Sequence, residues 1–174
     1  QENSQCTYHQ IRVRYELSVL YHHHNERQRS YMDKMKFKSL ITLMDTLKVR
    51  GVQYISGRII TQNDAVMFDI DDTLIFTDGT PNTPMIELLH IAKHLGYKIV
   101  IITARPGLKP VIDWTITQLG KYKIPNDYLG FTSAKTKTKM KQQLPYNFVL
   151  SVGDLETDLT DSEHKLNTSN FSHK

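Results

Sequence analysis

Short apolar runs alternate with amphipathic stretches over the second part of the chain. The runs are too short for helices and most are rich in β-branched side chains, so they predict buried strands. They lie at residues 65–68, 97–103, 127–132 and 147–152. Between them, residues 83–96 and 110–120 place apolar side chains at helical spacing. This order predicts βαβ units, and therefore an α/β fold with a parallel sheet.

Both helical stretches carry signals for a beginning and an end. The first has Pro84 in its opening turn and stops at Gly96, as helices commonly do. The second runs from Pro110 to Gly120 and contains Trp114 on its apolar repeat. Large aromatic side chains contribute most when they are buried, so we expect Trp114 in the core.

The first sixty residues are also predicted to be helical, but in a different pattern. Residues 10–21 mix apolar and polar side chains without a clean period, and we assign them to one helix. A second helix is predicted to begin at Ser30, with Asp33 completing a capping box, and to stop at Gly51. Residues 52–61 are then a connector or a short edge strand. We therefore divide the chain into an N-terminal helical extension, residues 1–61, and a catalytic domain, residues 62–174.

The second predicted helix carries an apolar stripe along one face, and several of its residues are methionines. Methionine fills irregular gaps in hydrophobic cores and also lines adaptable binding surfaces. Core packing against the catalytic domain is the favoured interpretation, and a partner-binding face is the alternative. The stripe consists of Met32, Met35, Leu40, Leu43, Met44 and Leu47.

Composition narrows the class of protein. The chain has 174 residues, 39% apolar content and a net charge of +4, which suits one folded domain with a modest extension. The mild positive charge permits anionic ligands and does not require nucleic acid. Cys6 is the single cysteine, so no internal disulfide is expected and a cytoplasmic location is favoured. No apolar run approaches the roughly 20 residues that span a bilayer, so no membrane partner is expected.

Three carboxylates follow the first apolar run, at Asp69, Asp71 and Asp72. The carboxyl ends of parallel strands form one edge of a sheet, where binding sites gather. Because burying several carboxylates without partners is very costly, a metal ion or another cation is expected nearby. The alternative is an acidic turn on the surface.

Polar side chains end the next strand as well. Thr103 closes residues 97–103, where its hydroxyl could donate to a phosphate oxygen held over Asp69. The alternative is that Thr103 caps the following segment. Arg105 is consistent either with a fork donor to an anion or with a surface ion pair.

Two further patterns complete the candidate site. Lysines alternate with small or polar residues at Lys135, Lys137, Lys139 and Lys141. The strip is either a solvated charged face or a phosphate-binding strip for nucleic acid; it has no interleaved aromatics for base stacking. After the last predicted strand, Gly153 precedes Asp154, and Asp158 follows one turn later.

Taken in order, these four motifs resemble those of the haloacid dehalogenase-like (HAD) phosphohydrolases, over about residues 62 to 160. The resemblance is closest to the capless acid-phosphatase-like branch, because Lys137-Thr138 with Lys141 and Leu144 is similar to its lysine motif. It implies a three-layer, Rossmann-like parallel sheet. The intervals from Thr73 to Thr103 and from Thr103 to Lys137 leave no room for a large cap domain.

The resemblance implies an activity, a set of catalytic residues and a metal site for this chain. The resemblance implies a Mg2+-dependent phosphatase that forms an aspartyl-phosphate on a phosphorylated substrate of unknown identity. Nucleic-acid end processing and a non-catalytic binding protein on the same fold remain as alternatives. The implied catalytic residues are Asp69 as nucleophile, Asp71 as general acid/base, Thr103, and Lys137 with Lys135 as its competitor. The implied acid role of Asp71 leads us to expect it buried beside Asp69. The implied metal site consists of Asp69, Asp71, Asp154 and Asp158.

Overall fold

The computed structural model describes the backbone of residues 2–169 and the side chains of residues 25–169. The chain divides into two compact units, Gln1–Leu40 and Ile41–Lys174. The division falls within the first helix, α1 (Glu2–Ile55). None of the helices in the described residues is long and apolar enough to cross a membrane.

Helix α1 continues through the position where a stop was predicted. The prediction of two helices separated from each other and ending at Gly51 is wrong, because helical structure extends without a break to Ile55. Gly51 is needed for close packing: a Cβ there would lie 2.6 Å from Leu88 Cδ2 and 3.3 Å from Leu166 Cδ2. The expected connector or strand over residues 52–61 is thus helical in its first part and irregular only after Ile55.

The methionine-containing stripe of α1 is divided between two environments. Met44 and Leu47 are buried in the second compact unit, as the core-packing interpretation expects. Met32 and Met35 are exposed, at 53% and 45%. The core prediction is therefore correct for the part of the stripe in the second unit and wrong for these two methionines.

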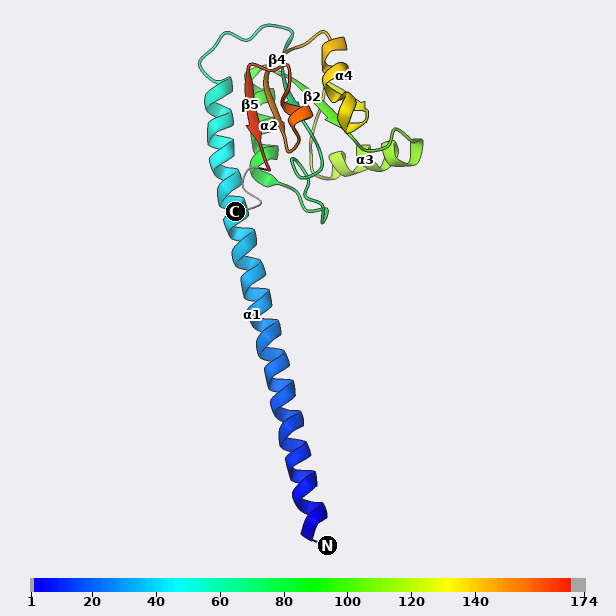
Figure 1. Ribbon diagram of the computed structural model, residues 1–174. Coiled ribbons are helices and arrows are strands. Elements are labelled where there is room, and N and C mark those ends of the chain that lie inside the picture. Colours follow the sequence, from blue (N-terminus) through cyan, green and yellow to red (C-terminus); the bar gives the residue numbers. More distant parts are fainter. Residues whose placement is uncertain (1, 170–174) are drawn as a thin grey trace. The chain divides into compact units, whose positions relative to one another are not determined.

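A five-stranded sheet forms the centre of the second unit (Figure 1). Its order is β3-β2-β1-β4-β5, and every pair of neighbours is parallel. The parallel α/β sheet predicted from the alternation of apolar runs and helices is confirmed, and β5 adds an edge strand. The strands are β1 (Asp64–Phe68), β2 (Lys98–Thr103), β3 (Tyr128–Phe131), β4 (Asn147–Gly153) and β5 (His164–Asn167).

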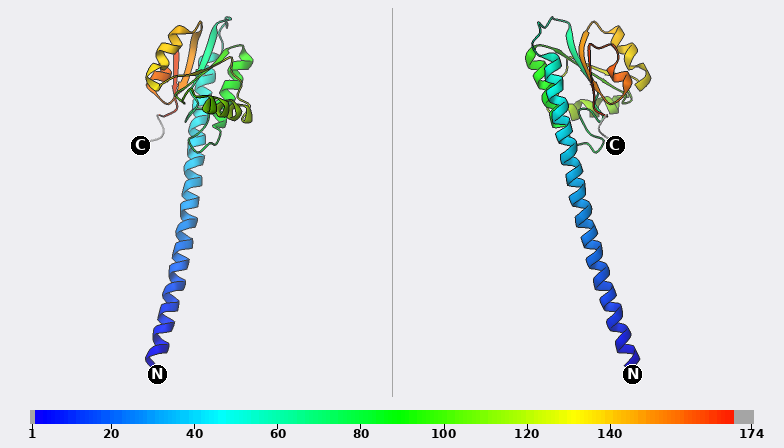
Figure 2. Two further views of the ribbon diagram at one scale, coloured as in Figure 1. Left: turned by 90° about the vertical axis from the view of Figure 1, so that its right-hand side faces the viewer. Right: turned by 60° about the vertical axis from the view of Figure 1, so that its left-hand side comes forward.

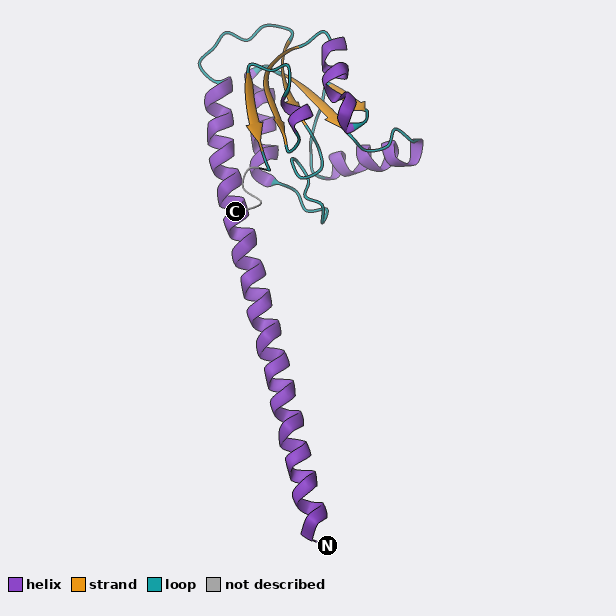
Figure 3. Cartoon of the chain, in the orientation of Figure 1, coloured by secondary structure: helices purple, strands orange, loops and turns teal. Residues whose placement is uncertain are grey.

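Helices cover both faces of this sheet. Figure 2 shows α2 (Thr83–Leu95) and α4 (Lys137–Gln143) on opposite sides of the strands, and Figure 3 shows the same helices and strands coloured by secondary structure. On the α4 side, Met140 packs against a core formed by alternate strand residues such as Met67 and Val100. Two short elements, the 3₁₀ turn Ala134–Thr136 and α5 (Glu156–Leu159), complete this layer. Within residues 2–169, neither the interval from Thr73 to Thr103 nor the interval from Thr103 to Lys137 contains a large cap domain.

Helix α3 (Lys109–Lys121) differs from expectation at its aromatic residue. Trp114 is 56% exposed, so the prediction that it lies in the core is wrong. The guanidinium of Arg105 lies over the indole, 4.6 Å from the ring centroid, and that cation–π contact accounts for its position. Helix α3 buries only Thr115 and Leu119.

Candidate active site

The polar residues expected at strand ends do meet at one edge of the sheet. Asp69 directly follows β1, Thr103 ends β2, and Asp154 directly follows β4. These three strands are neighbours in parallel register. Parallel alignment therefore places side chains that are far apart in sequence at the same carboxyl edge, where open α/β sheets bind ligands.

Lys137 is the central cation of this edge. Its Nζ donates to Asp69 Oδ1 at 2.8 Å and to Asp158 Oδ1 at 2.6 Å, and the residue is only 1% exposed. Lys137 opens α4, and its side chain links Asp69, directly after β1, to Asp158 in α5. Lys135 is exposed in the preceding 3₁₀ turn. Of the two lysines considered from the sequence, Lys137 is the one that contacts Asp69.

Close packing at Gly153 fixes the position of Asp158. A Cβ on Gly153 would lie 2.6 Å from Asp158 Cγ, so only glycine permits this approach. The second oxygen of Asp158, Oδ2, accepts from the backbone N–H of Leu155 at 3.0 Å. Asp158 is thus fully buried with both oxygens engaged, which holds its first oxygen toward Lys137.

The buried charges at this edge do not balance. Oxygens of Asp69, Asp154 and Asp158 all lie within 4.8 Å of one another, with Lys137 as the contacting ammonium. Burial raises the pKa of Asp69 to about 8, against the attraction of Lys137. Burial also raises the pKa of Asp154. Burial alone would lower the pKa of Lys137, but Asp69 and Asp158 outweigh it and raise that pKa.

This donor set fits a divalent cation. With all three carboxylates ionised, Lys137 leaves two negative charges uncompensated, which a dication would neutralise. Asp154 Oδ1 is buried without a hydrogen-bond partner, and such an orphaned acceptor calls for an ion or a water. A site made of carboxylate oxygens suits a hard cation such as Mg2+.

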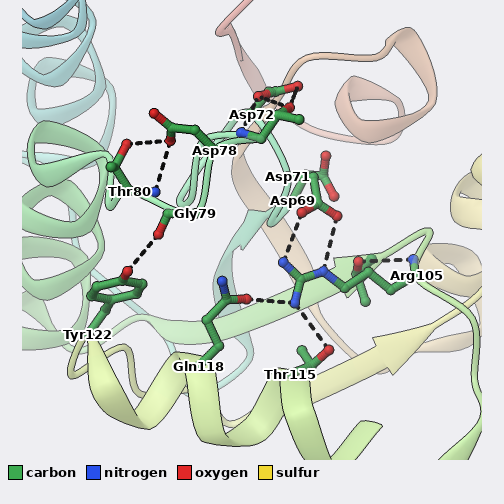
Figure 4. Close-up of polar contacts among 12 residues, drawn as sticks. Asp69, Asp71, Asp72, Asp78, Gly79, Thr80, Arg105, Thr115, Gln118 and Tyr122 are labelled. Atoms are coloured by element: carbon green, nitrogen blue, oxygen red, sulfur yellow. Dashed lines mark hydrogen bonds and ion pairs between the residues drawn. The ribbon is translucent and has the colours of Figure 1, made fainter. Parts of the chain in front are cut away.

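Asp71 lies apart from this group of carboxylates. Its side chain is 51% exposed, so the expectation that it is buried beside Asp69 is wrong. Arg105 holds it instead, through Nη2 to Oδ1 at 2.8 Å and Nε to Oδ2 at 3.1 Å (Figure 4). The metal-binding group within the described residues is formed by Asp69, Asp154 and Asp158, without the Asp71 carboxylate.

The remaining predicted residues fall into two environments. Thr103 is fully buried, and its Oγ1 accepts from the Arg105 backbone N–H at 3.1 Å, which leaves the hydroxyl proton for another acceptor. Asp72 adopts a left-handed backbone conformation with φ 57° and accepts from the N–H and hydroxyl of Thr77. Asp72 therefore shapes the turn after β1.

Two residues of the site have surroundings that sequence reasoning did not anticipate. Lys141 is 2% exposed and donates to Ser151 Oγ at 2.9 Å, Ser162 Oγ at 3.1 Å and the carbonyl oxygens of Asp158 and Thr160. Its spacing of four from Lys137 was the available signal, since residues one turn apart share a helix face. The hydrogen bonds between Arg105 and Asp71 could not be predicted from the residues near Arg105 in the sequence, because the partners of Arg105 lie on other elements.

Comparison with solved structures agrees with the observed architecture. A class C acid phosphatase from Bacillus anthracis superposes with a TM-score of 0.56 at 16% identity, covering 72% of this chain and 65% of the other. Its tungstate-bound form gives a TM-score of 0.55 at 17% identity, with the same coverages. The chain thus spans slightly less than two thirds of these acid phosphatases.

A third match is weaker. It is to a structure of a Pnkp1/Rnl/Hen1 complex, with a TM-score of 0.46 at 23% identity, covering 60% of this chain and 43% of the other. No protein-family model matches the chain, and no curated protein matches its sequence. The similarities show the fold: a five-stranded parallel α/β sheet without a large cap, similar to that of the class C acid phosphatases.

Proposed function

We propose that the chain is a Mg2+-dependent phosphomonoester hydrolase that works through an aspartyl-phosphate on Asp69. The observation that supports this most strongly is the contact of the buried Lys137 with Asp69 and Asp158, inside a group of three carboxylates at the carboxyl edge of the sheet. A site built only for stability would not gather two buried acids and a third, partly buried one near a single lysine, because the uncompensated charge is destabilising.

In the proposed reaction Asp69 attacks phosphorus, and the P–O bond to the leaving group breaks. Lys137 and the Thr103 hydroxyl stabilise charge on the phosphoryl oxygens, and Asp158 orients Lys137. Asp69 and Asp154 would hold the cation, with Asp158 beside them. When bound, Mg2+ would supply positive charge toward the phosphoryl group. Asp71 protonates the leaving oxygen and later takes a proton from the water that cleaves the aspartyl-phosphate.

The lysine strip gives less support to simple nucleic-acid binding. Lys137 and Lys141 are buried, whereas Lys135 and Lys139 are exposed. A strip that tracks a phosphate backbone needs its cations accessible, and half of these are committed to the interior. Polynucleotide ends remain one class of phosphomonoester for the substrate panel.

Phosphate release tests the proposal directly. Wild-type protein is assayed with sugar phosphates, nucleotides, phosphopeptides and phosphorylated oligonucleotide ends, in Mg2+ and in EDTA. We expect Mg2+-dependent turnover that Asp69→Asn abolishes and that Asp113→Asn, on the exposed face of α3, leaves unchanged. Activity that persists in Asp69→Asn, or absence of activity on the whole panel, would overturn the proposal.

A further inference from the structure

We infer that Arg105 is a positioning residue for the acid/base carboxylate of Asp71, and that helix α3 holds Arg105 for this task. The inference rests on the proposed function, since it concerns the proton that Asp71 delivers to the leaving oxygen. It assigns Arg105 to the proton-transfer step and excludes it from binding the phosphoryl group.

The contact between Arg105 and Asp71 has the geometry that fixes a carboxylate in orientation. Two separate N–H groups of the guanidinium meet the two oxygens of Asp71, at 2.8 and 3.1 Å (Figure 4). Such paired bonds restrict rotation of the carboxylate as well as its distance. Asp71 is half-exposed, and an exposed aspartate without this partner would sample several rotamers.

The rest of the guanidinium is committed to α3. Nη1 donates to Thr115 Oγ1 at 3.1 Å and to Gln118 Oε1 at 2.8 Å, and the Trp114 ring covers one face. Of the five N–H hydrogens that an arginine side chain offers, only one on Nη2 has no partner among these contacts. With Arg105 only 8% exposed, the side chain has no free fork for a phosphate.

The backbone of Arg105 connects this assembly to the phosphoryl site. Its N–H donates to Thr103 Oγ1 at 3.1 Å, and Thr103 ends the strand beside β1. Arg105 therefore sets the positions of both the Thr103 hydroxyl and the Asp71 carboxylate. A shift of Arg105 would move Asp71 relative to Asp69.

The chemical consequence depends on the leaving group. As the new bond between Asp69 and phosphorus forms and the old P–O bond breaks, the electron pair of the old bond goes to the leaving oxygen. A basic alkyl oxygen needs the proton of Asp71 in that step, whereas a nitrophenolate leaves readily without it. A positioning role therefore predicts damage that is large for alkyl phosphates and small for activated aryl phosphates.

The experiment compares kcat/KM of wild type, Arg105→Lys and Gln118→Leu on p-nitrophenyl phosphate and β-glycerophosphate, in Mg2+. The parameter kcat/KM reports steps through formation of the aspartyl-phosphate, so the later role of Asp71 as a base does not mask the effect. For Arg105→Lys we expect a loss on β-glycerophosphate at least about tenfold larger than on p-nitrophenyl phosphate, since acid catalysis contributes about 10²–10⁴-fold. Gln118→Leu should show a smaller difference of the same sign, and Thr117→Ala, exposed on α3, none.

Inhibition by inorganic phosphate separates positioning from phosphate binding. Positioning leaves the inhibition constant of Arg105→Lys close to that of wild type. Equal losses on both substrates, or phosphate inhibition weakened in proportion to the lost activity, would overturn the inference. If either result were found while wild type was active and Asp69→Asn was inactive, the proposed function would stand without this role for Arg105. A wild type inactive on both esters and on the whole substrate panel would overturn the proposed function and this inference together.

Discussion

Lys137 and Lys141 lie one turn apart on α4 and are equally buried, yet their surroundings differ in kind. Lys137 donates to the carboxylates of Asp69 and Asp158. Lys141 donates to two serine hydroxyls and two backbone carbonyls, and its ammonium lies 5.1 Å from the centre of the Phe148 ring. The same side chain in the same helix thus compensates full negative charge in one place and satisfies only neutral dipoles in the other.

The two pKa directions follow from this difference. Burial lowers the pKa of both ammonium groups, but the carboxylates beside Lys137 reverse that effect and raise its pKa. Burial lowers the pKa of Lys141 to about 8, because hydroxyls and carbonyls replace less of the lost hydration than ionised partners do. In the proposed reaction Lys137 acts on the phosphoryl group, and Lys141 holds the backbone of Asp158 and Thr160 in place.

The largest effect should come from removing the compensating charge, in Lys137→Met. We expect activity to fall by about 10²–10³-fold or more, the effect of losing one preorganised charge donor. In EDTA the free energy of unfolding should fall by about 3–5 kcal/mol, because breaking a buried ion pair leaves carboxylates unpaired. Thermal unfolding and steady-state kinetics measure both.

Mg2+ provides the control within that comparison. A dication at Asp69 and Asp154 would replace part of the missing positive charge, so Mg2+ should stabilise Lys137→Met more than it stabilises wild type. Lys139→Met, exposed on the same helix, should resemble wild type in activity and stability. If Mg2+ stabilised neither protein, the carboxylate group would not be a metal site.

The sequence predicted the parts of this edge that depend on strand ends. Asp69, Thr103 and Asp154 each follow an apolar run, and parallel pairing alone is enough to bring such residues together. Lys137 was chosen over Lys135 by its place in a motif, and the structure gives a physical reason: the first residue of α4 faces the strands, whereas the 3₁₀ turn before it leaves Lys135 in water.

What the sequence could not predict depends on contacts between distant segments. Gly51 looks like a helix stop until Leu88 and Leu166 are seen against it. Trp114 fits the apolar repeat of α3 and is nevertheless exposed, because Arg105 from the end of β2 supplies its partner. The same arginine moves Asp71 away from the buried acids. None of these contacts has a periodic signature, since each joins elements that are separate in the chain.

A smaller effect is expected when the second lysine is replaced, in Lys141→Met. The apolar stem is largely retained, but the ammonium over the Phe148 ring is lost, and Ser151, Ser162 and two carbonyl oxygens lose a donor. Each buried group left without a partner costs about 1–3 kcal/mol. The two serine hydroxyls lie within hydrogen-bond distance of each other, and Ser162 also donates to the Thr160 carbonyl, so the Asp158 carbonyl is the group that loses its donor. We expect a net loss of about 1–3 kcal/mol in unfolding free energy, and a loss of activity smaller than in Lys137→Met. Activity losses of equal size would show that both lysines act on the reaction.

The smallest effect concerns the pH dependence of stability, in which the two lysines should differ in sign. The pKa of Lys141 is about 8 in the folded protein and near 10.5 in an unfolded chain, so above pH 8 the unfolded state binds more protons. Its contribution to the free energy of unfolding should therefore rise with pH, by about 1 kcal/mol between pH 7 and 9. Lys137, whose pKa is raised, stabilises the fold throughout this window and loses that contribution only as pH rises through its folded pKa, above 10.5.

Urea unfolding in EDTA at pH 7, 8 and 9 measures how the free energy of unfolding changes with pH. Asp69, whose pKa is raised to about 8, contributes a fall of similar size in both proteins, so the informative quantity is the difference between them. The free energy of unfolding of wild type relative to Lys141→Met should rise by about 1 kcal/mol between pH 7 and 9. An identical pH dependence in the two proteins would mean that Lys141 keeps an ordinary pKa despite its burial.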